Sequence, residues 1–302
     1  MLLKHPKEAS SGRFCRYAMK SIQRCSCNAD ERKNKVQYFQ YGAAGIATRK
    51  VRIYMSTENN IIQIENLKFA YENGPKILKG INLTIQKGKL IGLIGDSGCG
   101  KSTLCHMMCG IIPNVIGGSA SGQIRVKDKN MRETELKDMA QTVGFVMQDS
   151  DRMIVSSTVE DELAFGPENL CIPPEEIRSR VDSTLELLHM TEFKETDPNH
   201  LSGGQKQLVT IGAVLTLQPD ILILDEPFSH LDEGARIRTM ELLMQLKSEG
   251  KTIIIVEHDH QLIEEADEWI LLENGLVRIQ GTPEAVKEKL LDRFACTNRG
   301  RI

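Results

Sequence analysis

Residues 90–102 read LIGLIGDSGCGKS, an apolar run from Leu90 to Ile94 followed directly by eight residues from Gly95 to Ser102. The eight residues fit the phosphate-binding pattern G-x-x-x-x-G-K-[ST], and the apolar run predicts a buried strand. Glycines suit such a loop because successive backbone N–H groups must curl around a phosphate, in a conformation that a Cβ would obstruct. A helix beginning near Lys101 then points its positive end at the anion. The sequence therefore predicts a site for a nucleoside triphosphate.

Two side chains of this loop have distinct expected roles. Lys101 supplies a point charge for the β- and γ-phosphates, and the Ser102 hydroxyl is placed to bind Mg²⁺. The alternative, a glycine-rich turn with an incidental lysine, leaves the preceding strand unexplained. We expect the triphosphate to contact the following residues: Gly95, Asp96, Ser97, Gly98, Cys99, Gly100, Lys101, Ser102 and Thr103.

A second apolar run, from Ile221 to Leu224, ends in the two carboxylates Asp225 and Glu226. We expect it to be the strand next to the strand of the phosphate loop in a parallel sheet. Asp225 would then hold the Mg²⁺ shell, and Glu226 would face the γ-phosphate and polarise the attacking water. Two acids that merely end a strand at the surface are the alternative.

A third apolar run, 252–256, precedes His258 by one residue. His258 is therefore expected at the carboxyl end of a strand, where open α/β sheets bind their ligands. An imidazole there can hydrogen-bond the γ-phosphate, although a lone histidine at a strand end is more often structural.

The segment Leu201-Ser202-Gly203-Gly204-Gln205 precedes a helical pattern over 206–217. Ser202 suits the N-cap, and the two glycines expose backbone donors, so this is a second candidate anion site. It belongs to an inserted helical stretch that opens at Pro173-Pro174. The apolar stripe of that stretch is formed by Ile177, Val181, Leu185 and Leu188.

These motifs resemble those of the ATP-binding cassette (ABC) ATPases, whose signature LSGGQ stands unaltered at 201–205. The resemblance covers residues 61 to about 290. It implies an α/β phosphate-loop NTPase core with an antiparallel β subdomain and an inserted α-helical subdomain at about 149–215, all within a domain of 55–290. It also implies ATP and Mg²⁺ as ligands, and ATP hydrolysis as the activity.

In that family two cassettes pair head to tail, and each ATP lies between one phosphate loop and the partner's LSGGQ. By resemblance, the residues that act on the partner's ATP are Ser202, Gly203, Gly204, Gln205 and Asp232. Gln148 matches the glutamine that touches Mg²⁺ and the attacking water, so the implied catalytic set is Glu226, His258 and Gln148, and the implied metal set is Ser102, Gln148 and Asp225. His230 departs from the small or amide residue more usual before Leu231-Asp232.

Tyr71 stands where the family keeps an aromatic side chain that stacks on adenine, with Phe69 as the second choice. Both residues would point to the same face of a strand, so burial of Tyr71 in the core is the alternative.

The segments 148–155 and 158–169 resemble the energy-coupling factor branch of the family, whose ATPases drive uptake of vitamins or of cobalt or nickel ions. The resemblance implies that Met153, Ile154 and Val155 form an apolar floor for a helix of a membrane subunit. Burial of Ile154 and Val155 in the helical core is the alternative. The acidic run 160–162 is expected to face water on the first turn of a helix, where negative charge is favourable.

The implied partners are a second ABC ATPase subunit (in a homodimer or a heterodimer), a membrane coupling subunit and a small substrate-binding membrane protein, with no nucleic acid. The implied location is the cytoplasmic face of the cell membrane. Two alternatives stay open. One is another ABC importer branch. The other is a soluble ABC ATPase of DNA repair, chromosome organisation or translation, which generally carries long insertions that are not visible between Lys101 and Asp225.

Composition indicates a globular chain with a basic N-terminal segment. The chain is 40% hydrophobic and 26% charged, and it has no apolar run of 18 residues. Residues 1–54 carry a net charge of +9, against −3 for the whole chain. We interpret 1–54 as a mis-called start before Met55 or a disordered basic tail, a lipid- or nucleic-acid-binding arm being the alternative, and 291–302 as a C-terminal tail.

The eight cysteines lack both paired C-x-x-C spacing and a secreted framework, so reduced thiols are expected. A zinc site from Cys15, Cys25 and Cys27 matches no common ligand spacing.

Overall fold

The computed structural model describes residues 59–127, 129–131 and 133–290, and three strands nearer the N-terminus. Those strands pair antiparallel in the order β1 (Gln23–Arg24), β2 (Val36–Tyr41) and β3 (Arg49–Tyr54), within a first unit of residues 1–59. The predictions for the basic segment 1–54 otherwise lie outside the described residues. So do those for the three N-terminal cysteines and for the tail 291–302. They stay predictions.

The second unit is built on a six-stranded sheet in the order β13-β12-β6-β11-β10-β9. All neighbours are parallel except β13, which pairs antiparallel with β12. Its strands are β6 (Leu90–Ile94), β9 (Val143–Val146), β10 (Ile221–Asp225), β11 (Thr252–Glu257), β12 (Glu268–Glu273) and β13 (Leu276–Gly281). β6 and β11 are buried along their whole length, as expected of central strands covered on both faces.

The strand order corrects one prediction. β10 is not the neighbour of the phosphate-loop strand β6, because β11 lies between them and hydrogen-bonds to both. Parallel strands still bring their carboxyl ends to one edge, so Glu226 and His258 follow adjacent strands there. Strand order depends on long-range pairing, which the apolar runs do not specify.

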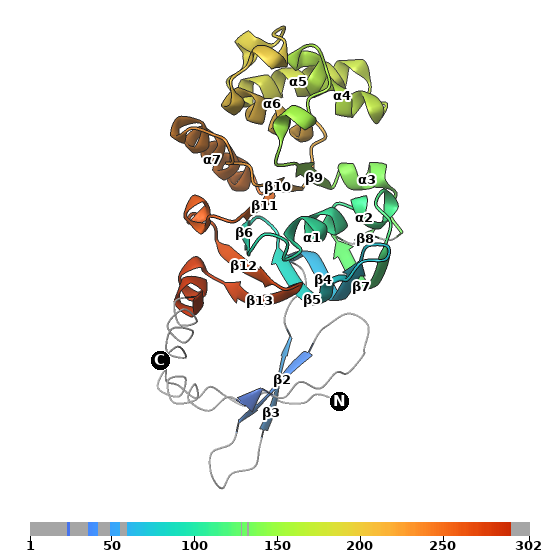
Figure 1. Cartoon of the computed structure of the whole chain (residues 1–302), viewed down its shortest axis with the longest axis vertical. Coiled ribbons are helices and arrows are strands. Elements are labelled where there is room, and N and C mark those ends of the chain that lie inside the picture. Colours follow the sequence, from blue (N-terminus) through green and yellow to red (C-terminus); the bar gives the residue numbers. More distant parts are fainter. Residues whose placement is uncertain are drawn as a thin grey trace, which may run out of the picture. The chain divides into compact units, whose positions relative to one another are not determined.

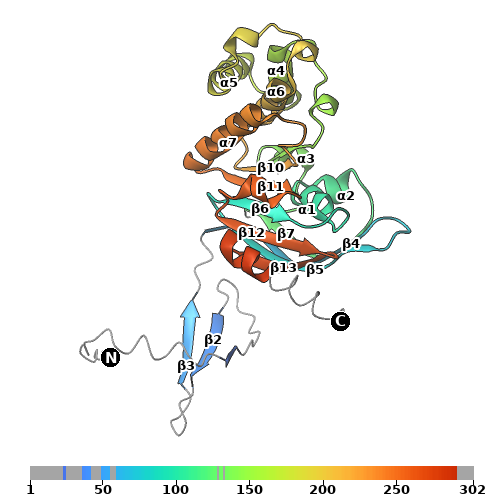
Figure 2. The same cartoon turned by 60° about the vertical axis from the view of Figure 1, so that its left-hand side comes forward.

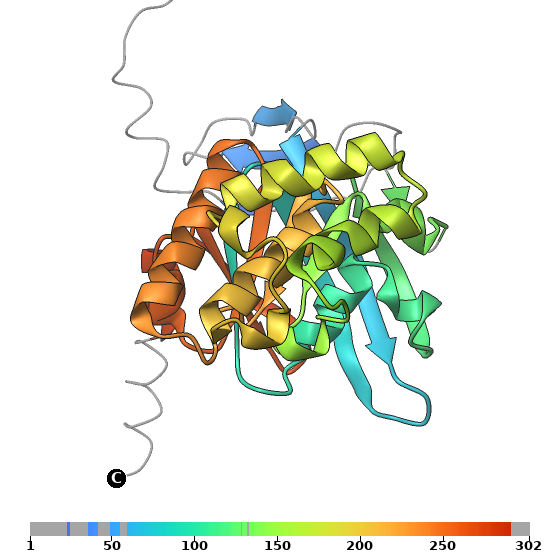
Figure 3. The same cartoon turned by 90° about the horizontal axis from the view of Figure 1, so that it is seen from above.

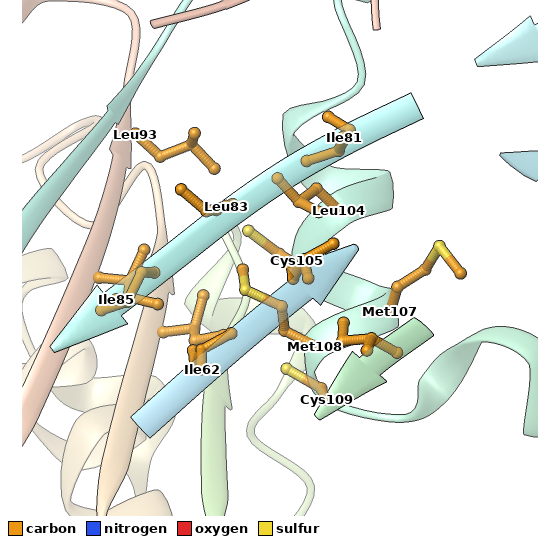
Figure 4. Close-up of a cluster of buried hydrophobic side chains, with 14 of the residues drawn as sticks. Ile62, Ile81, Leu83, Ile85, Leu93, Leu104, Cys105, Met107, Met108 and Cys109 are labelled. Atoms are coloured by element: carbon orange, nitrogen blue, oxygen red, sulfur yellow. The ribbon is translucent and has the colours of Figure 1, made fainter. Parts of the chain in front are cut away.

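A second sheet is antiparallel, and helix α1 (Lys101–Met108) packs against side chains of both sheets. The order of this sheet is β5-β4-β7-β8, and its strands are β4 (Asn60–Ala70), β5 (Lys76–Gln86), β7 (Ser119–Val126) and β8 (Lys129–Asn130). Leu104, Cys105 and Met108 of α1 lie in one buried cluster with side chains of both sheets (Figure 4). The helix that follows the phosphate loop is therefore fixed by apolar packing on two sides. The short helix α2 (Ile111–Asn114) comes next.

Residues 150–215 form a helical layer that lies between β9 and β10 in the sequence. The short helix α3 (Leu136–Ala140) precedes β9. Figures 1 and 2 show it at the opposite side of the six-stranded sheet from β4 and β5, and Figure 3 views it from above. Its elements are η3 (Ser150–Arg152), α4 (Val159–Asn169), α5 (Pro174–Leu187), η4 (Thr191–Phe193), η5 (Pro198–His200) and α6 (Gly203–Leu215). The predicted stripe from Ile177 to Leu188 is buried.

Two elements connect the remaining strands, α7 (Glu233–Ser248) and η6 (His260–Ile263). Residues 283–290 are helical as well. Within the described part of the chain, no helix has the length and apolar character needed to cross a membrane.

Candidate active site

The phosphate loop is shaped by glycines that cannot be replaced without conflict. Gly95 has a φ of 150°, and a Cβ built on it would lie 2.1 Å from the carbonyl oxygen of Leu272. Gly100, the N-cap of α1, has a φ of 108°. The side chain of Lys101 is 7% exposed. It folds back over the loop, where Nζ donates to the carbonyl oxygens of Gly95 at 2.6 Å and Asp96 at 3.1 Å. The loop thus carries its own cation at the predicted phosphate site.

Asp225, at the end of β10, lies beside the start of α1. Burial raises the pKa of its carboxyl, as does the charge of Glu226, while a hydrogen bond from Ser102 lowers it. A half-buried carboxylate beside a hydroxyl is an oxygen donor pair of the kind that Mg²⁺ prefers, and the Gln148 amide offers a third oxygen. The donor set therefore fits the predicted metal. Among the described residues, no group of three or more His, Cys, Asp or Glu side chains forms another candidate metal site.

Glu226 is held in an uncommon backbone conformation, with a φ of 48°. Its N–H donates to the carbonyl of Val256 at 2.9 Å, and the Ser229 hydroxyl donates to its carbonyl at 2.8 Å. Left-handed residues other than glycine need such surrounding bonds to persist. These bonds fix the direction in which the carboxylate leaves the end of β10.

Three residues predicted to act in hydrolysis meet at this carboxylate. Gln148 Nε2 donates to Glu226 Oε2 at 2.7 Å, and His258 Nδ1 lies 3.6 Å from Glu226 Oε1. Gln148 follows β9, Glu226 follows β10 and His258 follows β11, so three neighbouring strands deliver one group each. Gln148, Asp225, Gly203 and His230 also line one cleft of about 570 Å³.

The two candidate aromatic residues differ in burial. Phe69 is 1% exposed and belongs to the core, whereas Tyr71 is 37% exposed. The Tyr71 hydroxyl lies 3.0 Å from the Thr103 Oγ1, and its ring meets Phe69 edge to face. Of the two, Tyr71 is the ring that a ligand at the phosphate loop can reach.

The signature segment caps its helix in the predicted way. Ser202 is the N-cap of α6, with a reciprocal capping box to Gln205 at 2.9 and 3.3 Å. Asp232 caps α7 by accepting from the N–H of Ala235 at 2.8 Å. A Cβ built on Gly203 would meet no atom within 4 Å. In the single chain, Gln205 and Asp232 are therefore engaged in capping, while Gly203 faces open space.

Glu162 corrects the expectation that the acidic run 160–162 faces water. Its side chain is buried, and Oε2 accepts from the backbone N–H groups of Val155 at 2.9 Å and Ser156 at 2.8 Å. Acids in a first helical turn are usually exposed, so the local sequence carries no signal of this role. Glu162 ties the loop that follows η3 to α4.

Glu257, the last residue of β11, is a second buried acid that the motifs do not reveal. It is 1% exposed, and its Oε1 has no hydrogen-bond partner in the described part of the chain. Burial raises its pKa to about 7, with the charges of Glu226 and Asp259 adding to the rise. The backbone N–H groups of Phe228 and His258 face the carboxyl and lower its pKa, which partly offsets the rise.

The raised pKa of Glu257 makes stability depend on pH. Its folded pKa of about 7 exceeds the ordinary value of 4.5, so the folded state holds the proton more tightly and loses stability as pH rises from 4.5 through 7. Glu257→Gln removes that loss, which amounts to at most about 3 kcal/mol. We expect the melting temperatures of the variant and the wild type to be closest near pH 5, with the variant gaining relative to the wild type by pH 8. A difference independent of pH would contradict this.

Comparison with known proteins places these features in one class. Residues 78–229 match the ABC transporter family. The chain is 26% identical to an ATP-binding cassette solved as a dimer in a post-hydrolysis state bound to ADP and Pi, with a TM-score of 0.64 over 73% of this chain and 98% of that chain. The protein is an ABC ATPase, as the resemblance of its motifs implies.

Two further relatives define the branch. The chain is 41% identical to the energy-coupling factor transporter ATP-binding protein EcfA1 of Caldanaerobacter subterraneus, over 75% of this chain and 82% of that protein. It is 35% identical to cbiO1 of Clostridium perfringens, part of the ABC transporter complex cbiONQ, with a TM-score of 0.69 over 78% of this chain and 94% of that chain. The chain belongs to the ATP-binding proteins of energy-coupling factor transporters.

Proposed function

We propose that this chain powers an energy-coupling factor importer that takes up a vitamin or cobalt or nickel ions through separate membrane subunits. The observation that carries the proposal is the part of the chain from Met147 to Phe165, which combines exposed apolar side chains with a buried anchor. The similarity to EcfA1 and to a subunit of the cbiONQ complex supports the same branch. The working place of the chain is then the cytoplasmic face of the membrane.

We propose that three exposed apolar side chains, Met147, Val155 and Phe165, act together as a docking surface. Their exposed fractions are 40%, 66% and 50%. Of the three residues expected to form its floor, Met153 packs against the helical core and accepts from the N–H of Met147 through Sδ at 3.2 Å. Ile154 is half-buried, and Val155 is exposed. An apolar helix needs such exposed anchors on a fixed frame.

Glu162 supplies that frame. Its carboxylate binds the amides of Val155 and Ser156, so the exposed Val155 stands on backbone that is hydrogen-bonded to α4. A second pair of contacts joins η3 to α6: Lys206 to Asp151 at 2.7 Å and Ser150 to Gln207 at 2.9 Å. A force applied at the docking surface therefore reaches the helix that begins at the signature segment.

Substitution of Val155 tests the docking role. Val155→Asp places a charge on the surface that a partner helix would desolvate, so we expect loss of the membrane subunits in affinity purification from detergent-solubilised native membranes. Val115→Asp is the matched control, because Val115 is 67% exposed against 66% for Val155. Recovery of membrane partners by both variants would contradict the docking surface. The small multi-span protein recovered with the control would identify the cargo.

For the chemistry we propose the roles implied by the motifs. ATP binds at the phosphate loop with adenine against Tyr71. Ser102, Asp225 and Gln148 hold Mg²⁺, which neutralises phosphate charge when bound. Glu226 polarises the attacking water, His258 donates to the γ-phosphate, and Gln148 contacts the attacking water as well as the metal.

We further propose that two cassettes close head to tail over ATP. Ser202 and the two glycines of the signature segment then contact the partner's ATP, with Gln205 and Asp232 beside them. The open space at Gly203 supports this, because a phosphate can approach backbone that no side chain covers. ATP shifts the equilibrium toward the closed pair by the affinity that these contacts add.

A further inference from the structure

Glu257 differs from the other deeply buried charged side chains. Lys101 donates to two loop carbonyls, and Glu162 accepts from two backbone amides. Glu257 is buried more completely than either, yet its Oε1 has no partner in the described part of the chain. Burying a carboxylate without full pairing is unfavourable. Packing alone does not account for an acid at this position.

The contacts of Glu257 link two segments of the site. The backbone N–H groups of Phe228, two residues after Glu226, and of His258 face its carboxyl closely enough to lower the pKa, and His258 Nδ1 lies 3.9 Å from Oε2. It thus joins the end of β11 to the segment that follows β10. Glu257 therefore neighbours both the segment that follows Glu226 and the residue His258.

The imidazole of His258 stands between two carboxyl groups. Its Nδ1 lies 3.6 Å from Glu226 Oε1 and 3.9 Å from Glu257 Oε2. Gln148 donates to Glu226 on the other side. Four side chains therefore form a row in which each neighbours the next: Gln148, Glu226, His258 and Glu257. Glu257 is the innermost of them, and His258 is 60% exposed by comparison.

We propose that Glu257 is a positioning residue for ATP hydrolysis, which holds His258 against Glu226 and ties the segment after Glu226 to β11. This rests on the proposed roles of Glu226 and His258. Glu257 is 1% exposed, so a bound ligand has almost no access to it and it acts through its neighbours. The titratable groups that face it in the described part of the chain are Glu226, His258 and Asp259.

The proton on Glu257 then influences the site. A neutral Glu257 adds no negative charge beside Glu226, whereas an ionised one does, and the raised pKa of about 7 puts this change inside the working range of an enzyme. Glutamine keeps an oxygen acceptor for the N–H groups of Phe228 and His258 but stays neutral. Glu257→Gln is therefore a mimic of the protonated form.

The experiment is the kcat and KM of ATP hydrolysis by the full chain between pH 6 and 8.5, for wild type, Glu257→Gln and Glu264→Gln. Glu264 is a surface carboxylate six residues after His258, with 54% of its side chain exposed. We expect a wild-type inflection in kcat near pH 7 that Glu264→Gln keeps and Glu257→Gln lacks. The kcat of Glu257→Gln should stay within twofold of the wild-type value at pH 6, with KM for ATP unchanged.

An inflection that persists in Glu257→Gln, or one that is absent from the wild type, overturns the proposal. Should that variant not fold, Glu257→Asp decides: it should keep an inflection and lower kcat, and an unchanged kcat overturns the proposal. The roles of Glu226 and His258 fail separately, by retained hydrolysis in Glu226→Gln, so the two failures are distinguishable.

Discussion

Glu226→Gln should abolish most ATP hydrolysis and trap an ATP-bound dimer. The amide cannot take a proton from the attacking water, so we expect kcat to fall at least about 100-fold. ATP affinity should stay close to that of the wild type, because Lys101 and the loop amides are untouched. Bound ATP that is not hydrolysed keeps the closed state populated. Size-exclusion chromatography with light scattering in ATP and Mg²⁺ measures the dimer.

Two further variants sharpen this result. Glu264→Gln should hydrolyse ATP like the wild type. Adding Gly203→Ala to Glu226→Gln places a methyl group where the partner's phosphate would approach, so the trapped dimer should revert to monomers. A Glu226→Gln protein that binds ATP normally yet runs as a monomer would refute the head-to-tail arrangement.

Gly95→Ala should disrupt both folding and nucleotide binding. A φ of 150° is unfavourable for alanine. Its Cβ would also lie 2.1 Å from the Leu272 carbonyl oxygen and 2.9 Å from Cys99 Sγ. The carbonyl belongs to β12, which pairs with strands on both sides, so relief requires movement of that strand or of the loop. We expect the free energy of unfolding to fall by about 3 kcal/mol or more. Thermal unfolding and binding of a fluorescent ATP analogue measure the two effects.

Gly203→Ala is the matched control for Gly95→Ala. Its built Cβ meets no atom within 4 Å, and alanine is favoured over glycine in the middle of a helix by roughly 0.5–1 kcal/mol, which is an upper limit for the first residue of α6. We expect a melting temperature equal to or slightly above that of the wild type, and unchanged ATP binding by the monomer. Equal melting temperatures for Gly95→Ala and the wild type would contradict the loop geometry described above.

Much of the site could be predicted because its information is local. The phosphate loop, the signature segment and the carboxylates at 225–226 are short motifs, and the structure places each at the end of the expected strand or the start of the expected helix. Ser202 illustrates this, since serine before two glycines and a glutamine specifies a capping box without reference to the rest of the fold.

The missed features depend on distant parts of the chain. The position of β11 between β6 and β10 is a matter of long-range strand pairing. The burial of Glu257 could not be predicted from the sequence. Because β11 is covered on both faces, its sequence shows no alternation of apolar and polar residues that would mark position 257 as buried. Glu162 looks like an ordinary acid of a first turn until the loop carrying Val155 folds onto it.

The hydrogen bonds of Lys101 affect the free energy with which the phosphate loop binds a nucleotide. Lys101 donates to the carbonyls of Gly95 and Asp96, so the protein's own backbone holds this side chain over the loop. A free lysine would lose about 2 kcal/mol of rotamer entropy on binding a phosphate. Here that loss was incurred during folding, and an arriving nucleotide exchanges one set of acceptors for another. The loop is thus preorganised by its own carbonyls, and its affinity for phosphate reflects a competition between carbonyl and phosphate oxygens for the same ammonium group.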